Sequence, residues 1–437
     1  MDEEAALQWI NSYEKFGSKF GLERITMLLD RLGNPQKNFY VIHVTGTNGK
    51  GSVCLFLGSI LQHAGYKVGV YLSPHLQRFT ERIQVNTQEI SPQELCRLVE
   101  QVKPVVEEIS LSGETPTYFE IVTAMAFLSF SQQQVEYAVV EVGLGGRLDA
   151  TNVVSPMVSV ITTIALEHTD VLGDSLKSIA REKAGIIKQD TPVVTAAKHT
   201  ALEVIETIAK EHNAPLIIVN ESSWRRINCT MTDQEFLIHG RFKDYPIRTH
   251  LLGEYQGENI AVAILTAEQL QMKGVYLSDP DIIEGVSNTV NPGRLEVITQ
   301  DPIILLDGAH NPQGTEKLKQ ALTTDFSYSN LILILGILKE KDYPQMVSIL
   351  APLAQTIICT RTANPRFCDP LILQKTIREL SMNKTVLVEP TIPQAIEHAR
   401  TLAQPNDLIC ITGSLFTVGE ARTILKTNKY LPPLSKI

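Results

Sequence analysis

A short run of residues in this chain has the composition of a phosphate-binding loop. It follows an apolar stretch, precedes a helical pattern, and consists of Gly46, Thr47, Asn48, Gly49, Lys50, Gly51 and Ser52. Glycines let the backbone curl so that successive N–H groups face one point, and the positive end of the following helix adds to that field. A lysine here can reach the β- and γ-phosphates of a nucleotide. The run predicts a site for a nucleoside triphosphate; a glycine turn with a chance lysine is the alternative.

The run departs from the standard P-loop, in which glycine, four residues and Gly-Lys precede serine or threonine. Here the leading glycine, Gly46, comes two positions late, and Gly51 directly follows Lys50. Ser52 can still bind a phosphate oxygen or Mg²⁺, but the pattern indicates its role less firmly than that of Lys50.

The elements around this loop alternate between short apolar runs and amphipathic helical patterns, which is typical of a mostly parallel sheet covered by helices. Strands are predicted at residues 39–45, 67–72, 137–142, 158–163 and 192–195. Helices are predicted at residues 52–64, 118–131, 176–184 and 257–272, and residues 224–250 are expected to form a small antiparallel patch. The loop therefore lies between the first of these strands and the first of these helices.

The segment Asn291-Pro292-Gly293-Arg294 is the best domain boundary, because proline and glycine together interrupt regular elements. A new series of strands is predicted beyond it, at residues 303–306, 330–336, 356–360, 386–388 and 408–412. We predict an α/β fold with a P-loop-containing parallel-sheet domain over residues 1–293 and a smaller Rossmann-like α/β domain over residues 294–437. A length of 437 residues agrees with two domains.

The composition excludes several classes of function. A net charge of −9 argues against broad nucleic-acid binding, although a few local Lys and Arg residues can still hold phosphates and carboxylates. The six cysteines are scattered without a C-x-x-C pair, so we expect reduced thiols. No apolar run approaches the ~20 residues of a membrane span, and the acidic start Met1-Asp2-Glu3-Glu4 does not resemble a signal peptide. We expect a cytoplasmic protein that binds neither nucleic acid nor membrane.

The loop sequence T-G-T-N-G-K-G-S resembles that of the folylpolyglutamate synthase and dihydrofolate synthase family, within the Mur-ligase superfamily. Further motifs of this family follow in order: Gly21-Leu22-Glu23-Arg24-Ile25, Leu32-Gly33-Asn34-Pro35-Gln36, Ser73-Pro74-His75-Leu76, Phe119-Glu120, Glu141-Val142-Gly143-Leu144-Gly145-Gly146-Arg147-Leu148-Asp149-Ala150-Thr151-Asn152, Glu167-His168-Thr169-Asp170-Val171-Leu172-Gly173, Glu182-Lys183-Ala184-Gly185-Ile186, Pro292-Gly293-Arg294-Leu295-Glu296 and Leu306-Asp307-Gly308-Ala309-His310-Asn311-Pro312. The ordered set is highly specific. It implies a monomeric ligase that uses ATP to join L-glutamate to the carboxylate of folate or dihydropteroate through an acyl phosphate.

The resemblance also implies roles for individual residues. It implies that Mg²⁺ is held by Ser73, Glu141 and His168, and that Lys50, Lys183 and His168 are catalytic. It implies that ATP is bound by the loop together with Asn259, Arg294, Asp307 and His310. The implied substrate-binding residues are Arg24, Ile25, Phe119, Glu120, Arg147, Asp149 and Ser414.

The residue types agree with this chemistry in part. Phosphoryl transfer to a carboxylate gathers several anions, so it needs a metal and fixed cations rather than a protein nucleophile. Mg²⁺ usually takes one or two carboxylates together with phosphates and water. Glu141 ends a predicted strand beside a glycine turn, where its carboxylate would face a ligand; a surface ion pair is the alternative. A histidine ligand such as His168 is unusual for so hard an ion.

Lys183 has the most specific implied role, since the resemblance implies that CO₂ carbamylates it and so turns a cation into an anion that supports the metal. Carbamylation requires a neutral amine, so the pKa of Lys183 must be lowered by burial or by nearby cations. A solvated lysine near the end of a helix is the alternative.

Two rival functions remain at this point. A cell-wall ligase of the same superfamily usually carries an additional N-terminal domain, and little sequence precedes the first strand here. A P-loop ATPase acting as a switch would leave the combination of Glu141, His168 and Lys183 unexplained. The sequence does not decide between dihydropteroate and reduced folate as the acceptor.

Overall fold

The computed structural model of the protein describes residues 1–17, 20–380 and 384–427. It divides into two compact units. Unit 1 consists of Met1–Arg226, Phe236–Arg248 and Gly257–Thr289, and unit 2 of Ile227–Glu235, Thr249–Gln256 and the chain from Val290 onward. Among the helices so described, none is long and apolar enough to cross a membrane.

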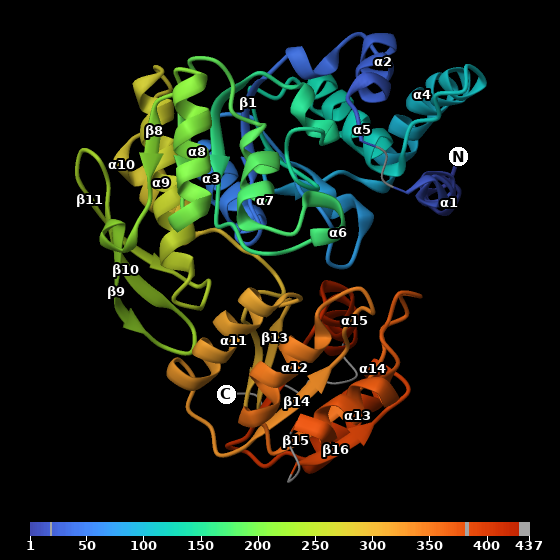
Figure 1. Cartoon of the computed structure of the whole chain (residues 1–437), viewed down its shortest axis with the longest axis vertical. Coiled ribbons are helices and arrows are strands. Elements are labelled where there is room, and N and C mark those ends of the chain that lie inside the picture. The colour runs from blue at the N-terminus through green and yellow to red at the C-terminus, as the bar shows by residue number, and fades with distance from the viewer. Residues whose placement is uncertain (18–19, 381–383, 428–437) are drawn as a thin grey trace, which may run out of the picture. The chain divides into compact units, whose positions relative to one another are not determined.

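Unit 1 is built on an eight-stranded sheet with the order β4-β3-β2-β5-β1-β6-β7-β8 (Figure 1). Its strands are β1 (Tyr40–Thr45), β2 (Val68–Tyr71), β3 (Ile83–Val85), β4 (Gln88–Glu89), β5 (Tyr137–Glu141), β6 (Pro156–Ile161), β7 (Val193–Thr195) and β8 (Leu216–Ile218). The neighbours from β2 to β8 pair in parallel, and β3 and β4 extend one edge as antiparallel strands. Since parallel strands end at the same edge, the loops after β1, β2, β5 and β6 lie at one edge of the sheet.

Helices cover both faces of this sheet. They are α1 (Glu3–Asn11), α2 (Glu23–Arg31), α3 (Lys50–His63), α4 (Pro92–Leu111), α5 (Tyr118–Gln132), α6 (Thr169–Leu172), α7 (Leu176–Ala184), α8 (His199–Glu211), α9 (Gln256–Met272) and α10 (Asp279–Ser287). Phe127 and Phe130 of α5 share a buried cluster with Val41, Ala138 and Val140, which lie at alternate positions of β1 and β5 and so point to one face. Helix α3 contacts β1, β2 and β5, and α10 packs on α3 (Figure 1).

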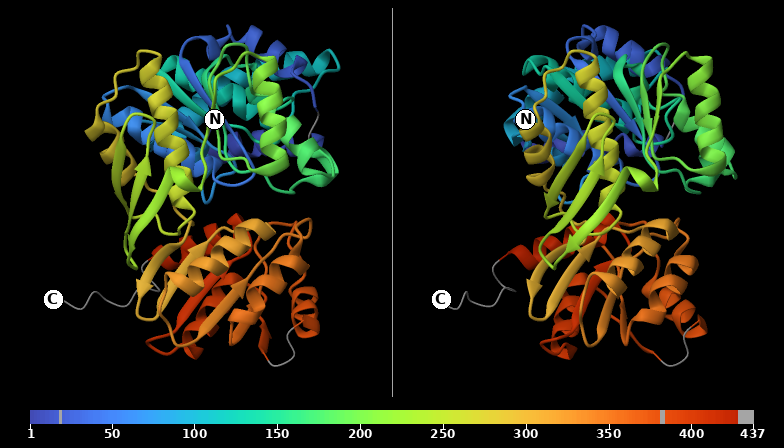
Figure 2. Two further views of the ribbon diagram at one scale, coloured as in Figure 1. Left: turned by 60° about the vertical axis from the view of Figure 1, so that its left-hand side comes forward. Right: turned by 90° about the vertical axis from the view of Figure 1, so that its left-hand side faces the viewer.

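Unit 2 contains a six-stranded sheet with the order β12-β13-β17-β14-β15-β16. This part of the chain is coloured orange to red in Figure 2. Its elements are β12 (Glu296–Gln300), β13 (Ile303–Asp307), α11 (Pro312–Thr324), β14 (Leu331–Leu335), α12 (Tyr343–Leu350), β15 (Thr356–Cys359), α13 (Pro370–Leu380), β16 (Thr385–Val388), α14 (Ile392–Leu402), β17 (Leu408–Thr412) and α15 (Leu415–Lys426). Only the edge strand β12 is antiparallel among these described strands. One buried cluster joins α11, α12 and α13 to the sheet.

The predicted α/β class and the predicted strands are confirmed, with small shifts at their ends. The patch predicted for residues 224–250 is a three-stranded sheet with the order β11-β10-β9, made of β9 (Trp224–Cys229), β10 (Gln234–His239) and β11 (Asp244–Thr249). Helix α3 begins at Lys50, earlier than predicted. Helices α1, α2, α4, α6, α8 and α10 of unit 1 were not predicted, and neither were strands β3, β4, β8 and β12.

Candidate active site

The glycine-rich loop connects β1 to α3. Strand β1 ends at Thr45 and α3 begins at Lys50, so the free N–H groups of the first helical turn belong to the loop sequence itself. Gly46 and Gly49 have φ angles of 147° and 88°, which L side chains rarely adopt. Strand, turn and helix N-terminus together form a backbone geometry that suits an anion.

Two lysines converge on one carbonyl oxygen of this loop. Lys50 donates from Nζ to Gly46 O at 3.1 Å and to Thr47 O at 3.2 Å. Lys183, at the end of α7, donates to the same oxygen of Gly46 at 2.8 Å, and only 4% of its surface is exposed. The structure thus places two of the three predicted catalytic residues at the loop, and Lys183 is not a solvated surface lysine.

The environment of Lys183 favours the neutral amine. Burial, and after it the charge of Lys50, lower the pKa of Lys183 to about 7, although Glu167 and Asp149 act in the opposite direction. At that pKa roughly half of the amine is neutral near pH 7, whereas an ordinary lysine is almost entirely protonated. The condition that carbamylation requires is therefore met.

Residues at the end of β6 hold the loop in place, and the sequence did not single them out. Thr162 donates from Oγ1 to Asn48 O at 2.7 Å, and Thr47 N donates to Thr163 O at 2.7 Å. The hydroxyl of Thr47 donates to Ala165 O at 3.2 Å and accepts from Ala165 N at 3.1 Å. These bonds fix the loop before a ligand binds, which lowers the entropic cost of binding.

Asn259, predicted to contact adenine, lies in α9 and is buried against the loop. A Cβ atom added at Gly49 would lie 2.3 Å from Asn259 Oδ1. Glycine is therefore required at position 49 both by its φ angle and by this contact. The structure brings Asn259 to the predicted nucleotide site, while its contact with adenine remains a prediction.

Replacing Gly49 by alanine is expected to weaken ATP binding by about tenfold or more, because the new methyl group would displace Asn259. Gly65→Ala is the matched control: Gly65 also has a φ of 88°, but no heavy atom lies within 4 Å of its added Cβ. Both variants carry a backbone strain of about 1–2 kcal/mol. Calorimetric titration with ATP should separate them, and equal affinities would show that the Asn259 contact does not matter.

The carboxyl ends of β2 and β5 place Ser73 beside Glu141. Glu141 is 5% exposed, and its Oε2 accepts from Ser73 N at 2.8 Å. The same oxygen lies 3.9 Å from the position of a Cβ at Gly51, near the start of α3. Two of the three predicted magnesium ligands are thus adjacent to each other and to the loop. His168, the third, precedes α6 with a φ of 51°, and its Nε2 lies 3.6 Å from Glu167 Oε1.

The predicted metal ligands form an incomplete set. The described part of the chain contains no group of three or more His, Cys, Asp or Glu side chains placed to hold a metal. Glu141 is the one carboxylate among the predicted ligands, so an ion there would need water or phosphate oxygens as well. Such a set fits Mg²⁺, which keeps several waters and binds substrate phosphates, better than a closed zinc site.

Asp149 organises the glycine-rich turn after β5. Its Oδ2 accepts from Leu144 N at 2.9 Å, and its Oδ1 accepts from Thr151 N at 3.0 Å and from Thr151 Oγ1 at 2.5 Å. Burial raises the pKa of Asp149 above its ordinary value, although these hydrogen bonds oppose the shift. The geometry shows a residue that orders the turn; its contact with substrate remains a prediction.

His43, in the middle of β1, extends this network and was missed in the sequence. Its Nε2 lies 2.8 Å from Thr151 Oγ1. Because the Thr151 hydroxyl donates to Asp149, it must accept from His43, which places the proton on Nε2. Burial and the charge of Lys188 lower the pKa of His43 to about 3, so the ring is neutral. A histidine inside an apolar strand carries no sequence signal of this role.

Arg147 joins the turn after β5 to the end of α7. Its Nη2 lies 2.9 Å from Glu182 Oε1, and its backbone N donates to Glu182 O at 2.8 Å. A Cβ at Gly185 would lie only 2.3 Å from Arg147 Cβ, so the two segments are in close contact. This contact positions Lys183; the predicted role of Arg147 in substrate binding remains open to test.

Three of the residues predicted to bind the acceptor substrate lie close together. Phe119 and Glu120 are in the first turn of α5, and Arg24 of α2 contacts Glu120. Arg24 Nη2 is 3.1 Å from Glu120 Oε1, and Arg24 Nε donates to Glu120 Oε2 at 3.2 Å, so the two form a buried fork-like pair. The ring of Phe119 packs on Gly143, where a Cβ would lie 2.4 Å from Phe119 Cζ. Ile25 is fully buried in the hydrophobic core. The predicted contact of Ile25 with substrate is not favoured by this burial and stays a prediction.

Three predicted ATP-binding residues come together within unit 2. Asp307 ends β13; its Oδ2 accepts from Leu295 N at 3.0 Å and its Oδ1 from Ala309 N at 2.9 Å. Burial raises the pKa of Asp307, and the positive charge of Arg294 is the largest influence against that shift. The Asp307 carboxylate therefore fixes the turn after Arg294 and the turn that leads to His310.

Ser414, predicted to lie near the glutamate site, is the N-cap of α15. Its Oγ accepts from Thr417 N at 3.1 Å, and 1% of the residue is exposed. The cap is a sufficient structural reason for a serine here. Its contact with glutamate stays a prediction.

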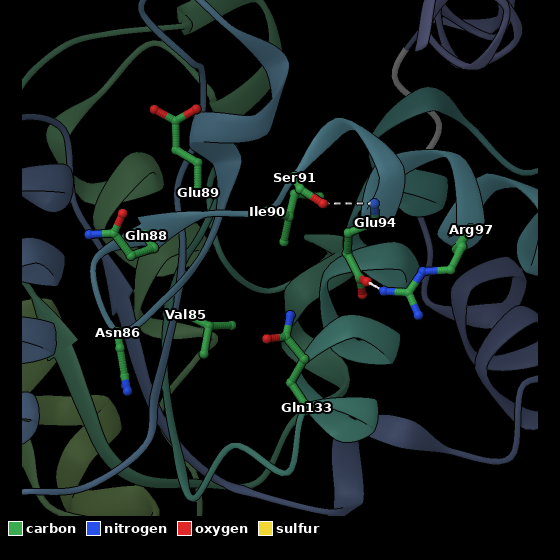
Figure 3. A pocket seen from close by; sticks show the side chains of 9 residues that line it. All are labelled: Val85, Asn86, Gln88, Glu89, Ile90, Ser91, Glu94, Arg97 and Gln133. Carbon is green, nitrogen blue, oxygen red and sulfur yellow. Dashed lines mark hydrogen bonds and ion pairs between the residues drawn. The ribbon is translucent and has the colours of Figure 1, made fainter. Parts of the chain in front are cut away.

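A separate pocket of 320 Å³ lies between the β3–β4 hairpin and the start of α4 (Figure 3). It is lined by Val85, Asn86, Gln88, Glu89, Ile90, Ser91, Glu94, Arg97 and Gln133. Its charged side chains already pair, Arg97 with Glu94 and Glu89 with Arg78. None of the predicted site residues lines this pocket, so it is not the predicted site.

Comparison with protein families identifies the class. The Mur ligase middle domain matches residues 44–267, and the glutamate ligase domain of Mur ligases matches residues 293–415. The first match contains the loop, Glu141 and Lys183, and the second contains Asp307 and His310. The fold and the residues gathered on it are therefore those of a Mur ligase.

Similarity over nearly the whole chain then defines the family. The dihydrofolate synthase/folylpolyglutamate synthase of Bacillus subtilis is 39% identical over 96% of this chain and 98% of that protein. The Escherichia coli protein of the same name is 32% identical over 96% of each. The structure of Mycobacterium tuberculosis folylpolyglutamate synthase complexed with ADP is similar with a TM-score of 0.91 and 32% identity, covering 97% of this chain and 99% of that one. The chain belongs to the dihydrofolate synthase/folylpolyglutamate synthase family.

Proposed function

We propose that this protein is an ATP-dependent ligase that adds L-glutamate to folate and also to dihydropteroate. One observation carries the proposal: two lysines converge on the glycine-rich loop, beside the adjacent Ser73 and Glu141 at the ends of β2 and β5. Phosphoryl transfer to a carboxylate requires fixed cations and a bound metal beside an anion-binding backbone, and Lys50, Glu141 and the loop are proposed to supply these.

In this proposal the loop amides and Lys50 hold the phosphates of ATP. Glu141, Ser73 and His168 would hold Mg²⁺, which when bound neutralises charge on the phosphates. Carbamylated Lys183 would supply an anion next to the loop in place of a second ammonium group. Replacement of the positive ammonium of Lys183 by a negative carbamate would explain why a lysine is buried so close to Lys50.

The reaction consists of two transfers. A carboxylate oxygen of the acceptor attacks the γ-phosphorus of ATP, the bond to the bridging oxygen breaks, and ADP leaves. The amine of glutamate then attacks the acyl carbon, loses a proton and displaces phosphate, which leaves an amide. Lys50 favours the first transfer because it offsets the negative charge that gathers on the phosphates.

Residues of unit 2 also have proposed roles. Arg294 and His310 are proposed to contact ATP, and Asp307 to accept from ribose hydroxyls while it fixes both neighbouring turns. Ser414 is proposed to lie at the glutamate site. We also propose that the protein acts as a monomer in the cytoplasm.

The proposal predicts that ADP release depends on both other substrates. Purified protein with ATP and Mg²⁺ should release ADP rapidly only when L-glutamate and either dihydropteroate or a reduced folate are present. Mass spectrometry should show each acceptor extended by one glutamate. Rapid ADP release in the absence of both substrates would instead indicate a P-loop ATPase switch. If glutamate is added to only one of the two acceptors, the proposed function is restricted to ligation of glutamate to that acceptor.

A further inference from the structure

Arg82 is a buried cation that the predicted site does not use. It ends the short 3-10 helix Phe79–Arg82, between β2 and β3, and is 8% exposed. Its Nε donates to His75 Nδ1 at 2.8 Å. The guanidinium carbon lies 5.9 Å from the ring centre of Phe79 and 5.7 Å from that of Tyr118. We call His75, Phe79, Arg82 and Tyr118 the Arg82 cluster.

The charge of Arg82 is not neutralised by any carboxylate in residues 1–17, 20–380 and 384–427. Glu81, its neighbour in the chain, instead accepts from the backbone N–H groups of residues 76–78. By contrast, the buried Arg24 pairs with Glu120, and the half-buried Arg422 pairs with Glu296. A charge removed from water without a partner is unfavourable, and contacts with aromatic rings offset only part of that loss.

His75 does not supply the missing negative charge. Because its Nδ1 accepts from Arg82, the remaining ring proton is on Nε2. A ring that accepts on Nδ1 carries a single proton and is neutral. A guanidinium has five N–H donors. The one on Nε is used here, and in the described structure no side chain or carbonyl accepts from Nη1 or Nη2.

The sheet places Arg82 between two parts of the predicted site. Leu72 N donates to Arg82 O at 2.9 Å, so Arg82 lies opposite the residue that precedes Ser73. Tyr118, on which its guanidinium stacks, precedes Phe119 and Glu120 in α5. The cluster thus connects the strand end next to Glu141 with the residues predicted to bind the acceptor.

We propose that Arg82 binds a carboxylate of the acceptor substrate, held in position by the other members of the Arg82 cluster. This inference rests on the proposed function, since it assumes an anionic pteroate or folate as the acceptor. A guanidinium can present two parallel N–H donors to a carboxylate, which is a strong and specific arrangement. A bound carboxylate would also provide the counter-charge that the described residues do not.

Steady-state kinetics of Arg82→Gln tests the proposal. The KM of the acceptor should rise about 10- to 100-fold, which is typical of losing a charge-assisted hydrogen-bonded pair, while the KM of ATP stays unchanged. Arg82→Lys should fall between wild type and Arg82→Gln. Arg78→Gln is the matched control, because Arg78 directly precedes the same short helix but pairs with Glu89, and its acceptor KM should not change.

A comparison of acid and amide ligands distinguishes binding from a structural effect. Equilibrium titration with dihydropteroate and with its carboxamide, in the absence of ATP, should show that wild type prefers the acid and that Arg82→Gln has lost this preference. If Arg82→Gln does not fold, as judged by thermal unfolding, the same titration of Arg82→Lys decides. Unchanged preference for the acid in the variant would overturn the inference. So would equal weakening of acid and amide binding. Absence of product with wild type would refute the proposed function, whereas the titration would still report on Arg82.

Discussion

Replacing Lys50 by methionine is expected to lower kcat/KM for ligation by about 10²–10³-fold, the loss typical of removing one preorganised group that stabilises transition-state charge. Lys50 begins α3, and its Nζ is held over the loop by Gly46 O and Thr47 O. No rearrangement is needed for this cation to face phosphates in the loop. Single-turnover formation of ADP, measured at saturating acceptor, reports the loss directly.

The same variant should change the state of Lys183. Because the charge of Lys50 contributes to the lowered pKa of Lys183, its removal should raise that pKa towards the ordinary lysine value. A smaller fraction of neutral amine would then be available for CO₂ at neutral pH. Lys210→Met, at an exposed position of α8, is a suitable control and should leave both the rate and Lys183 unchanged. A Lys50→Met variant with the wild-type rate would contradict the assignment of the loop.

Replacing Lys183 by alanine is expected to reduce kcat by roughly 10- to 100-fold, as the loss of a group that supports metal ligands usually does. Acetate or formate should restore part of the activity, because a small carboxylate can occupy the space of the carbamate. Lys188→Ala is the matched control: Lys188 is also partly buried and donates to a backbone carbonyl, Asn152 O at 3.4 Å. Full activity of Lys183→Ala without added acids would refute this role.

The carbamate itself should be visible without any turnover. Protein equilibrated with ¹³C-bicarbonate should show a carbamate carbon signal that is present in wild type and absent from Lys183→Ala. The amine reacts only when neutral, and its pKa of about 7 lies below the ordinary value. The signal should therefore increase as the pH rises through 7 and decrease below it. A wild-type protein with an unmodified Lys183 at every pH and bicarbonate concentration would exclude the modification.

The sequence by itself determined the fold class and the position of the glycine-rich loop between β1 and α3. Apolar runs with glycine turns predicted β1, β5 and β17 nearly to the residue, because buried parallel strands require continuous apolar stretches. The glycines and Lys50 were recognisable because their backbone and charge requirements are local. Helix α4 was missed, and Pro104 within it interrupts the helical pattern on which such a prediction depends.

Only the tertiary structure decided which side chains share an environment. The position of Lys183 near the end of a helix is typical of a surface lysine. In the structure α7 packs beside the loop, and this packing buries Lys183 and lowers its pKa. Thr162, His43 and Arg82 carry no sequence signal, because their roles depend on partners that are far away along the chain or absent from it. Burial and charge pairing arise from the whole sheet, so the chemical states of these residues could not be predicted from spacing alone.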